Sequence, residues 1–411
     1  MNVENLRNNY PKLITYMETA GYSNDYISRL RREIQWILAE ADTRGWNCYN
    51  NVYQHYEAIP LSPGKLEKKR AYIGAIMEFD LHGNYPDGKW SGLVERGAYP
   101  KLAPEFRSLI DYYCMAARER GKKESSINTE SKNVSAFLLS LQDAGINRLD
   151  DITEEAVMSV FVSPDGEQLK SYNYRKFISA VLKVCIPLNP DACRKVLSSF
   201  LPVTKRVRKN IQYLTPQEAH AILDAMDDMS NALTLRDRVI GKLAYYTGLR
   251  CCDIAAMDLA SIDWECDLIR IRQQKTEEPL ELALTATVGN AIYDYLTNER
   301  PPVDCPILFL TQQGPYRGME SSSIWRVAAR IMEEAGIRQS KGDRRGFHIF
   351  RHHLATTLLG NGVPQAVISG ALGHAVPESV EAYLSADLVH LKGCALSIAR
   401  FPVSEGVFAG E

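Results

Sequence analysis

The sequence predicts a mainly α-helical protein of several domains, with one small β-hairpin or sheet in the last of them. At 411 residues the chain is too long for one ordinary domain. Apolar residues recur at helical spacing along most of the chain, and stretches rich in glycine and proline interrupt this pattern. The composition, with 45% apolar and 24% charged residues, is that of a folded globular protein.

Apolar and glycine positions in the first half of the chain repeat with an offset of about one hundred residues. The matched positions are Ile27 with Ile127, Ile37–Leu38 with Phe137–Leu138, Gly45 with Gly145, and Val52 with Ile152. We interpret residues 1–85 and 103–200 as two copies of one small helical module. Short helices that end in glycine resemble one another in unrelated proteins, so this likeness alone does not indicate duplication. The shared offset of about one hundred residues is the observation that favours it.

Linkers separate these modules from each other and from a third domain, which we expect at 210–400. The first linker, "HGNYPDGKWSGLVERGAYPKLAP", is rich in glycine and proline. The second, 201–212, has basic residues but no acidic one. Its basic residues are Lys205, Arg206, Arg208 and Lys209. After it, Thr215–Glu218 has the pattern of a capping box with proline at the first helical position, which predicts a helix start.

The third domain is predicted to be helical with one β-hairpin. Apolar spacing predicts helices at 216–228, 235–247, 287–297, 321–335, 349–359, 364–372 and about 377–384. Two alternating stretches, 267–274 and 279–285, predict short strands that turn around Lys275–Thr276.

The composition disfavours membrane and disulfide-rich classes. No apolar run approaches the roughly 18 residues of a transmembrane helix, and the polar N-terminus lacks the apolar core of a secretory signal. The nine cysteines include one adjacent pair, Cys251 and Cys252, but no CxxC spacing. This pattern predicts reduced thiols in a cytoplasmic protein without a zinc site.

The net charge of −2 argues against a nucleic-acid partner, but the distribution of charge matters more than the sum. Basic clusters lie at three predicted element boundaries: 65–70, 201–212 and 338–351. One such cluster alone is usually solvated surface, whereas three at boundaries favour phosphate contacts. The candidate contacts in the last cluster are Lys341, Arg344 and Arg345.

Polar residues that could carry chemistry form four clusters in the third domain. They are Arg250 with Asp253, Lys275, His348 with Arg351, and His374 with Tyr383. An arginine three residues before an aspartate also suits a plain local ion pair, and a lysine on a turn is usually solvated. The histidines lack the HExxH spacing, so no metal site is expected.

If these side chains converge, they suit the transfer of a phosphoryl group. Two arginines match the oxygens of one phosphate, and histidines shuttle protons near neutral pH. A lysine can protonate a leaving oxygen, and a tyrosine hydroxyl can attack phosphorus to form a covalent ester. No ATP, metal or other cofactor is needed, because the phosphotyrosine bond conserves the energy and the arginines stabilise the transition state.

The ordered set of these residues resembles the tyrosine recombinase (phage integrase) family. The matching segments are "TGLRCCDI" around Arg250, "HIFRHHLATTLLGNGV" from His348, and "LGHAVPESVEAYL" with His374 and Tyr383. The resemblance covers about residues 210–390. Lys275 is assigned because it is the only lysine of the hairpin. Leu384 and Ser379–Val380 depart from the residues frequent in the family, which bears on the subfamily rather than on activity.

The resemblance implies a role for each residue. Tyr383 would attack the scissile phosphate and leave a 3′-phosphotyrosine and a free 5′-hydroxyl. The groups that would bind the phosphate and its transition state are Arg250, Arg351 and His374. Lys275 would protonate the 5′-oxygen, His348 would assist proton transfer, and Asp253 would orient the first arginine.

The resemblance also implies partners and an architecture. Module 103–200 would be the core-binding domain, and with the linker and the third domain it would form a C-shaped clamp around duplex DNA. Module 1–85 would contact accessory arm sites or other protomers. Family members act as tetramers on two DNA sites through a Holliday junction, with accessory directionality or DNA-bending proteins as further candidate partners. Segment 385–398 would dock on a neighbouring protomer or on its own domain.

These expectations favour a cytoplasmic, nucleoid-associated integrase or transposase of a mobile element. A Xer-type resolvase or a type IB topoisomerase would share the chemistry, although Xer-type enzymes are usually shorter. A regulator that binds DNA without cutting it would share only the fold. Such a regulator should show losses among the six active residues, and all six are present.

Overall fold

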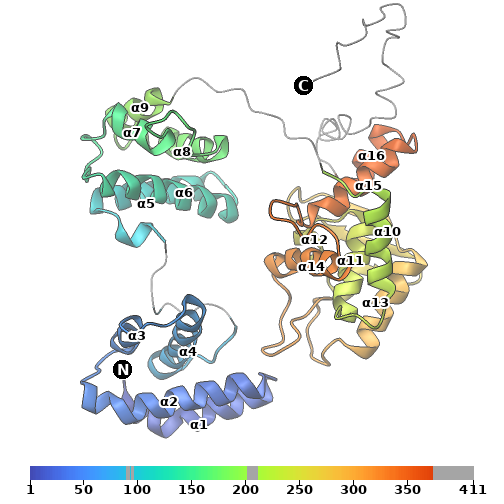
Figure 1. Cartoon of the computed structure of the whole chain (residues 1–411), viewed down its shortest axis with the longest axis horizontal. Coiled ribbons are helices and arrows are strands. Elements are labelled where there is room, and N and C mark those ends of the chain that lie inside the picture. The colour runs from blue at the N-terminus through green and yellow to red at the C-terminus, as the bar shows by residue number, and fades with distance from the viewer. Residues whose placement is uncertain (89–92, 94–96, 201–211, 374–411) are drawn as a thin grey trace, which may run out of the picture. The chain divides into compact units, whose positions relative to one another are not determined.

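The structure is a computed structural model that describes residues 1–88, 93, 97–200 and 212–373. It confirms a mainly α-helical fold with one small antiparallel sheet (Figure 1). The backbone contacts divide the chain into two compact units. One consists of Met1, Trp46–Met77 and Trp90–Arg208, and the other of Asn2–Gly45, Glu78–Lys89 and Lys209–Glu411. None of the described helices is both long and apolar enough to cross a membrane.

The first half of the chain forms two series of helices in the same order. The first series is α1 (Val3–Thr19), α2 (Asn24–Arg44), α3 (Tyr49–Glu57) and α4 (Pro63–His82). The second is α5 (Pro104–Glu119), α6 (Glu124–Asp143), α7 (Glu154–Phe161) and α8 (Tyr172–Cys185), followed by α9 (Pro190–Ser199). A short 3₁₀ turn, η1 (Tyr99–Lys101), precedes the second series.

Matched positions of the two series share burial and backbone conformation. The pairs Ile27 with Ile127, Ile37 with Phe137, and Val52 with Ile152 are buried. Gly45 and Gly145 both have positive φ, 64° and 92°, a conformation that side chains with a Cβ rarely adopt. The two series therefore agree in order, in burial at these positions and in this turn geometry, while their origin as two copies of one module stays a prediction.

The third domain contains the remaining helices and the sheet. Its helices are α10 (Pro216–Asp227), α11 (Leu235–Thr247), α12 (Cys251–Ala256), α13 (Ala286–Asn298), α14 (Ser321–Glu334), α15 (His348–Gly360) and α16 (Gln365–Leu372). The capping box at Thr215 and Glu218 is present, which confirms the predicted start of α10. The helix expected at 377–384 lies outside the described residues.

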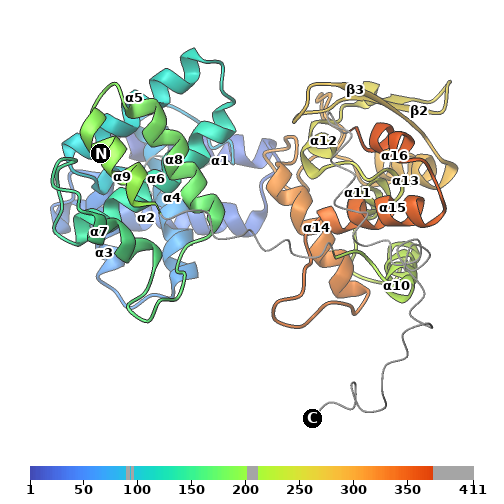
Figure 2. The same ribbon diagram turned by 90° about the horizontal axis from the view of Figure 1, so that it is seen from above.

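The sheet has three antiparallel strands in the order β1 (Ile262–Asp263), β2 (Leu268–Arg272) and β3 (Pro279–Ala283). The predicted hairpin is therefore confirmed, whereas β1 was missed because it has only two residues. Inward side chains alternate with outward ones, and the outward pair Arg270 and Glu281 forms an ion pair across the strands. Figure 2 shows β2 and β3 beside α12 and α16.

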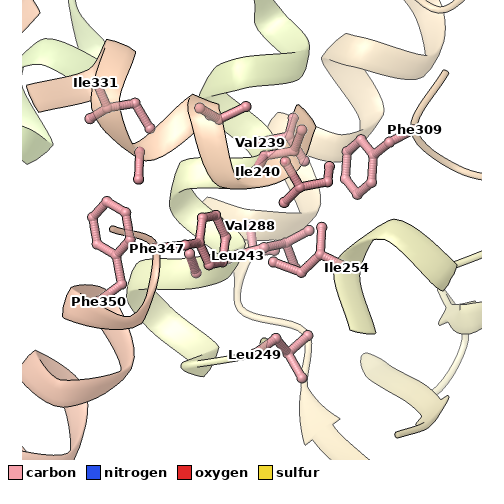
Figure 3. Packing of buried hydrophobic residues seen from close by; sticks show 14 of the residues in the cluster. Val239, Ile240, Leu243, Leu249, Ile254, Val288, Phe309, Ile331, Phe347 and Phe350 are labelled. Atoms are coloured by element: carbon pink, nitrogen blue, oxygen red, sulfur yellow. The ribbon is translucent and has the colours of Figure 1, made fainter. Parts of the chain in front are cut away.

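Helix α11 forms the centre of the third domain's core. Its residues Ile240, Leu243 and Ala244 are fully buried, and α13, α14 and α15 pack around it. Figure 3 shows Ile331 and Phe350 on the neighbouring helices turned toward this core. The core fixes how α11 and α15 approach each other, and both helices lead into the polar residues singled out above.

Gly241 of α11 lets α14 approach closely. A Cβ at this position would lie 2.4 Å from Cδ1 of Ile331 and 2.5 Å from the sulfur of Met226. We predict that Gly241→Ala lowers the free energy of unfolding by about 1–3 kcal/mol, because both neighbours must shift. Urea unfolding followed by circular dichroism measures this loss.

Gly370→Ala in α16 is the matched control. No atom lies within 4 Å of a Cβ built there, so this variant should keep or slightly raise stability. Equal effects of the two substitutions would contradict the proposed close packing of α11 and α14.

Candidate active site

A left-handed glycine directs the chain from α11 toward the candidate site. Gly248 ends α11 with φ 63°, and a Cβ there would lie 2.9 Å from the side chain of Leu372. The close approach and the backbone conformation both require glycine. Two residues later, Arg250 is the N-cap of α12, a helix of six residues that the sequence pattern did not predict.

Arg351 ties this turn to two other helices. It lies in the first turn of α15 and is only 4% exposed. Its Nη1 donates to the Gly248 carbonyl at 3.0 Å, and its Nη2 donates to the Leu372 carbonyl at 2.7 Å. One guanidinium therefore holds together the residues before Arg250 and the end of α16, after which His374 follows.

Arg250 and Asp253 form the ion pair that the sequence allowed, with Nη1 and Oδ2 3.7 Å apart. Asp253 also reaches the hairpin, because its Oδ1 accepts a hydrogen bond from the backbone amide of Gln274 at 2.8 Å. The carboxylate is fully buried between these two partners. It therefore orients Arg250 and fixes the strand end next to Lys275.

His348 experiences the charges of the other candidates. Its pKa lies below the ordinary value, first because protein atoms desolvate the ring and then because Arg351, Arg250 and Lys275 oppose a positive charge. Part of the side chain stays exposed to solvent. The structure thus brings four of the predicted residues into one region, where desolvation and three cationic side chains hold the pKa of the His348 imidazole below its ordinary value.

A cavity of about 560 Å³ lies beside His348. Its lining includes Gln212, Trp325, Arg344, Arg345, His352 and the backbone of Gly346. Trp325, on α14, is 47% exposed. The charged residues of the lining are Arg344, Arg345 and Asp343, so two cations, one carboxylate and an exposed indole lie beside His348.

Apart from Arg351, the basic residues of 338–351 divide into two groups. Arg338 forms a bidentate ion pair with Glu218, at 2.7 and 2.9 Å, and also donates to the Tyr213 carbonyl. It anchors the loop to the start of α10. Lys341 and Arg344 are exposed, and Arg345 is partly exposed.

Six predicted residues lie outside the described part of the chain. They are Lys205, Arg206, Arg208, Lys209, His374 and Tyr383. Two further residues of the region were missed from sequence, Trp325 and Gln273. Gln273 had a usable signal, because the alternation of β2 places it on the inward side together with Ile269 and Ile271.

Comparisons with known proteins agree with this arrangement. The sequence model of the phage integrase family matches residues 212–389. The putative integrase/recombinase y4gC of Sinorhizobium fredii is 37% identical over 188 residues, which are 46% of this chain and 95% of that protein. A second one from the same organism, y4rA, is 27% identical over 348 residues, 77% of this chain and 83% of y4rA. Tyrosine recombinase XerD of Corynebacterium glutamicum is 24% identical over 65% of this chain and 89% of XerD.

Two solved structures share the fold. A lambda integrase dimer bound to a COC′ core site superimposes with a TM-score of 0.52 at 17% identity, covering 79% of this chain and 87% of that one. XerH site-specific recombinase bound to difH substrate gives 0.51 at 19% identity, covering 84% and 94%.

The chain therefore belongs to the phage integrase family, and by class it is a tyrosine recombinase. The family and the fold class predicted from the sequence are both confirmed.

Acidification should destabilise the fold through His352. Burial lowers its pKa to about 4, with smaller effects from His348, Arg351 and Arg344. The unfolded chain binds the proton first, near a pKa of about 6.5. The stability is therefore complete above about pH 6.5 and declines as the pH falls toward about 4, by at most about 1.4 kcal/mol per pH unit for one proton.

Urea unfolding at several pH values measures this slope. His352→Gln should flatten it, because the glutamine side chain does not titrate in this range. His348 and His353 shift in the same direction, so some slope should remain in His352→Gln. An unaltered slope in His352→Gln would contradict the assignment.

Proposed function

We propose that this protein is the recombinase of a mobile element, which cuts and rejoins DNA through a 3′-phosphotyrosine at Tyr383. The observation that carries the proposal is that Arg351 and Asp253 join Arg250, the start of α15 and the turn that carries Lys275, in a member of this family. Such a site stabilises the negative charge of a phosphoryl transition state and leaves one imidazole able to accept a proton.

Each residue has a part in the proposed reaction. The Tyr383 hydroxyl attacks the scissile phosphorus, and His348 assists removal of its proton. The bond from phosphorus to the 5′-oxygen breaks, and Lys275 gives that oxygen a proton. The phosphate charge is held by Arg250, Arg351 and His374. A 5′-hydroxyl of another strand then attacks the phosphotyrosine and rejoins the DNA. The proposed reaction therefore needs neither ATP nor a metal ion.

Strand exchange by a tetramer on two DNA sites through a Holliday junction completes the proposal. Module 103–200 is proposed to bind the core site, with the basic segment 201–212 on the backbone between it and the third domain. Module 1–85 is proposed to bind further DNA or another protomer, and accessory proteins are proposed to set direction. We place the protein in the cytoplasm, on the nucleoid.

Among the sequence relatives, the integrase/recombinase y4rA matches more of this chain than XerD does, whereas in structure the Xer-type XerH covers 84% of it. The XerD of Corynebacterium glutamicum is covered almost entirely, yet it accounts for 65% of this chain. The match with y4rA extends over 77% of the chain. A Xer-type resolvase remains the second candidate, and the products distinguish the two: an integrase joins element DNA to a separate target, whereas a resolvase separates directly repeated copies of one site.

Covalent trapping tests the nucleophile. Duplexes tiled from the DNA that flanks the gene carry a nick near each candidate crossover, so that the short fragment diffuses away after cleavage. The wild-type protein should form an adduct that survives a denaturing gel. Tyr383→Phe should form none, because the attacking hydroxyl is gone.

Tyr293→Phe is the matched control for this experiment. Tyr293 is a 62% exposed tyrosine of α13, and its loss should leave the adduct unchanged. An adduct that persists in Tyr383→Phe would exclude that nucleophile. Binding to every duplex without any adduct would favour the regulator that only binds DNA.

Trp325 should contribute to DNA affinity. We predict that Trp325→Ala weakens binding to the cleaved duplex by about fivefold or more, because its exposed indole N–H can donate to a DNA phosphate, and a hydrogen bond to a charged group is worth roughly 1.5–3 kcal/mol. Trp264→Ala is the control, because Trp264 has the same 47% exposure but lies in the β1–β2 turn, outside the cavity lining. Fluorescence anisotropy at fixed salt measures both, and equal affinities would rule out the contact.

A further inference from the structure

Gln273 is a buried polar residue at the point where the lysine hairpin meets the candidate site. It follows β2 directly and is 1% exposed. The preceding inward residues, Ile269 and Ile271, are apolar, so an amide at the next inward position departs from the pattern. A buried amide is costly unless its oxygen and nitrogen both find partners.

The surroundings of Gln273 determine how its amide is oriented. With the oxygen toward Arg250, Oε1 accepts from Nη1 of that arginine at 3.1 Å. The Nε2 atom then donates to the Gly373 carbonyl and to the Thr276 hydroxyl, both at 2.7 Å. The opposite orientation would turn amide donors toward a guanidinium, which has only donors, so the first orientation satisfies every group.

Only glycine at position 373 leaves room for this contact. A Cβ at this position would lie 2.2 Å from the nearest atom of the Gln273 amide group, and the φ of 60° at Gly373 is left-handed. Glycine therefore allows α16 to end directly on the Gln273 amide. The next residue of the chain is His374, so the contact fixes where the chain leaves α16.

A second link runs parallel to the first. The neighbouring amide of Gln274 donates to Asp253, which is also paired with Arg250. The hairpin is thus joined to Arg250 twice, once through the Gln273 side chain and once through Asp253. Thr276, which follows Lys275, is held by the same glutamine.

We infer that Gln273 is a positioning residue for phosphoryl transfer. Its amide joins three parts of the site: the guanidinium of Arg250, the backbone ahead of His374, and the turn that carries Lys275. This inference rests on the proposed function, because it assigns Gln273 to that reaction. The side chain supports the groups that act on the phosphate and does not itself contact DNA, so its loss should slow cleavage without weakening binding.

Gln273→Met removes all three polar contacts at similar size. Single-turnover cleavage of the nicked duplex should fall by about 10- to 100-fold, the scale of a lost hydrogen bond to a charged group. The dissociation constant for the same duplex should change by less than about threefold. Gln312→Met, a remote exposed glutamine, should match the wild type in both measurements. Cleavage by Gln273→Met at the wild-type rate, or a loss explained by weaker binding, would overturn the inference.

Gln273→Glu adds a pH profile that a purely structural role would not produce. As a carboxylate the new side chain accepts from Arg250 but cannot donate to the Gly373 carbonyl. Protonated, it regains one donor and one acceptor, like the amide. The ratio of its cleavage rate to that of the wild type at the same pH should therefore rise on acidification. A constant ratio would argue against the positioning role. Thermal unfolding at each pH checks that both proteins remain folded.

Hydrogen exchange separates this inference from the proposed function. In Gln273→Met, without DNA, protection should fall together in 248–254 and 273–277 and stay unchanged in α13. Unaltered protection would overturn the coupling even if no duplex is cleaved. If Gln273→Met loses protection but the wild-type protein forms no adduct with DNA, the coupling through Gln273 is retained and the proposed recombination chemistry is rejected.

Discussion

The buried guanidinium of Arg351 is the constraint on which the candidate site depends. A charge that is 4% exposed must find partners inside the protein, and it finds the carbonyls of Gly248 and Leu372. These two carbonyls lie at the ends of α11 and α16, which are far apart in sequence. The same side chain that is proposed to hold the phosphate thus also assembles the scaffold around it.

Local patterns of the sequence predicted the elements, while the contacts between them needed the structure. Alternation predicted the hairpin, and the capping box at Thr215 predicted the start of α10. The two-residue β1 is too short for any periodicity. Spacing alone could not place Arg250 beside Gln273 and the end of α16, because burial and long-range hydrogen bonds bring them together. Only the family resemblance anticipated that Arg250, Lys275, His348 and Arg351 converge.

The near-neutral net charge is compatible with a DNA-acting protein because many basic residues pair within the fold. Arg338 binds Glu218, and Arg70 binds Glu67, although both belong to clusters that the sequence marked as basic. Arg344 and Arg345 instead line the cavity beside His348. A charge that is paired locally contributes little to the electrostatic field at long range. The position of the basic residues in the cavity lining therefore determines the electrostatic potential near His348.

The double link between Arg250 and the hairpin has a consequence for the order of events in the proposed reaction. The arginine that stabilises charge on the phosphate and the turn that carries the proton donor share Asp253 and Gln273 as supports. Displacing the hairpin therefore removes an acceptor from Arg250 while it moves Lys275. Charge stabilisation and leaving-group protonation are then gained or lost together.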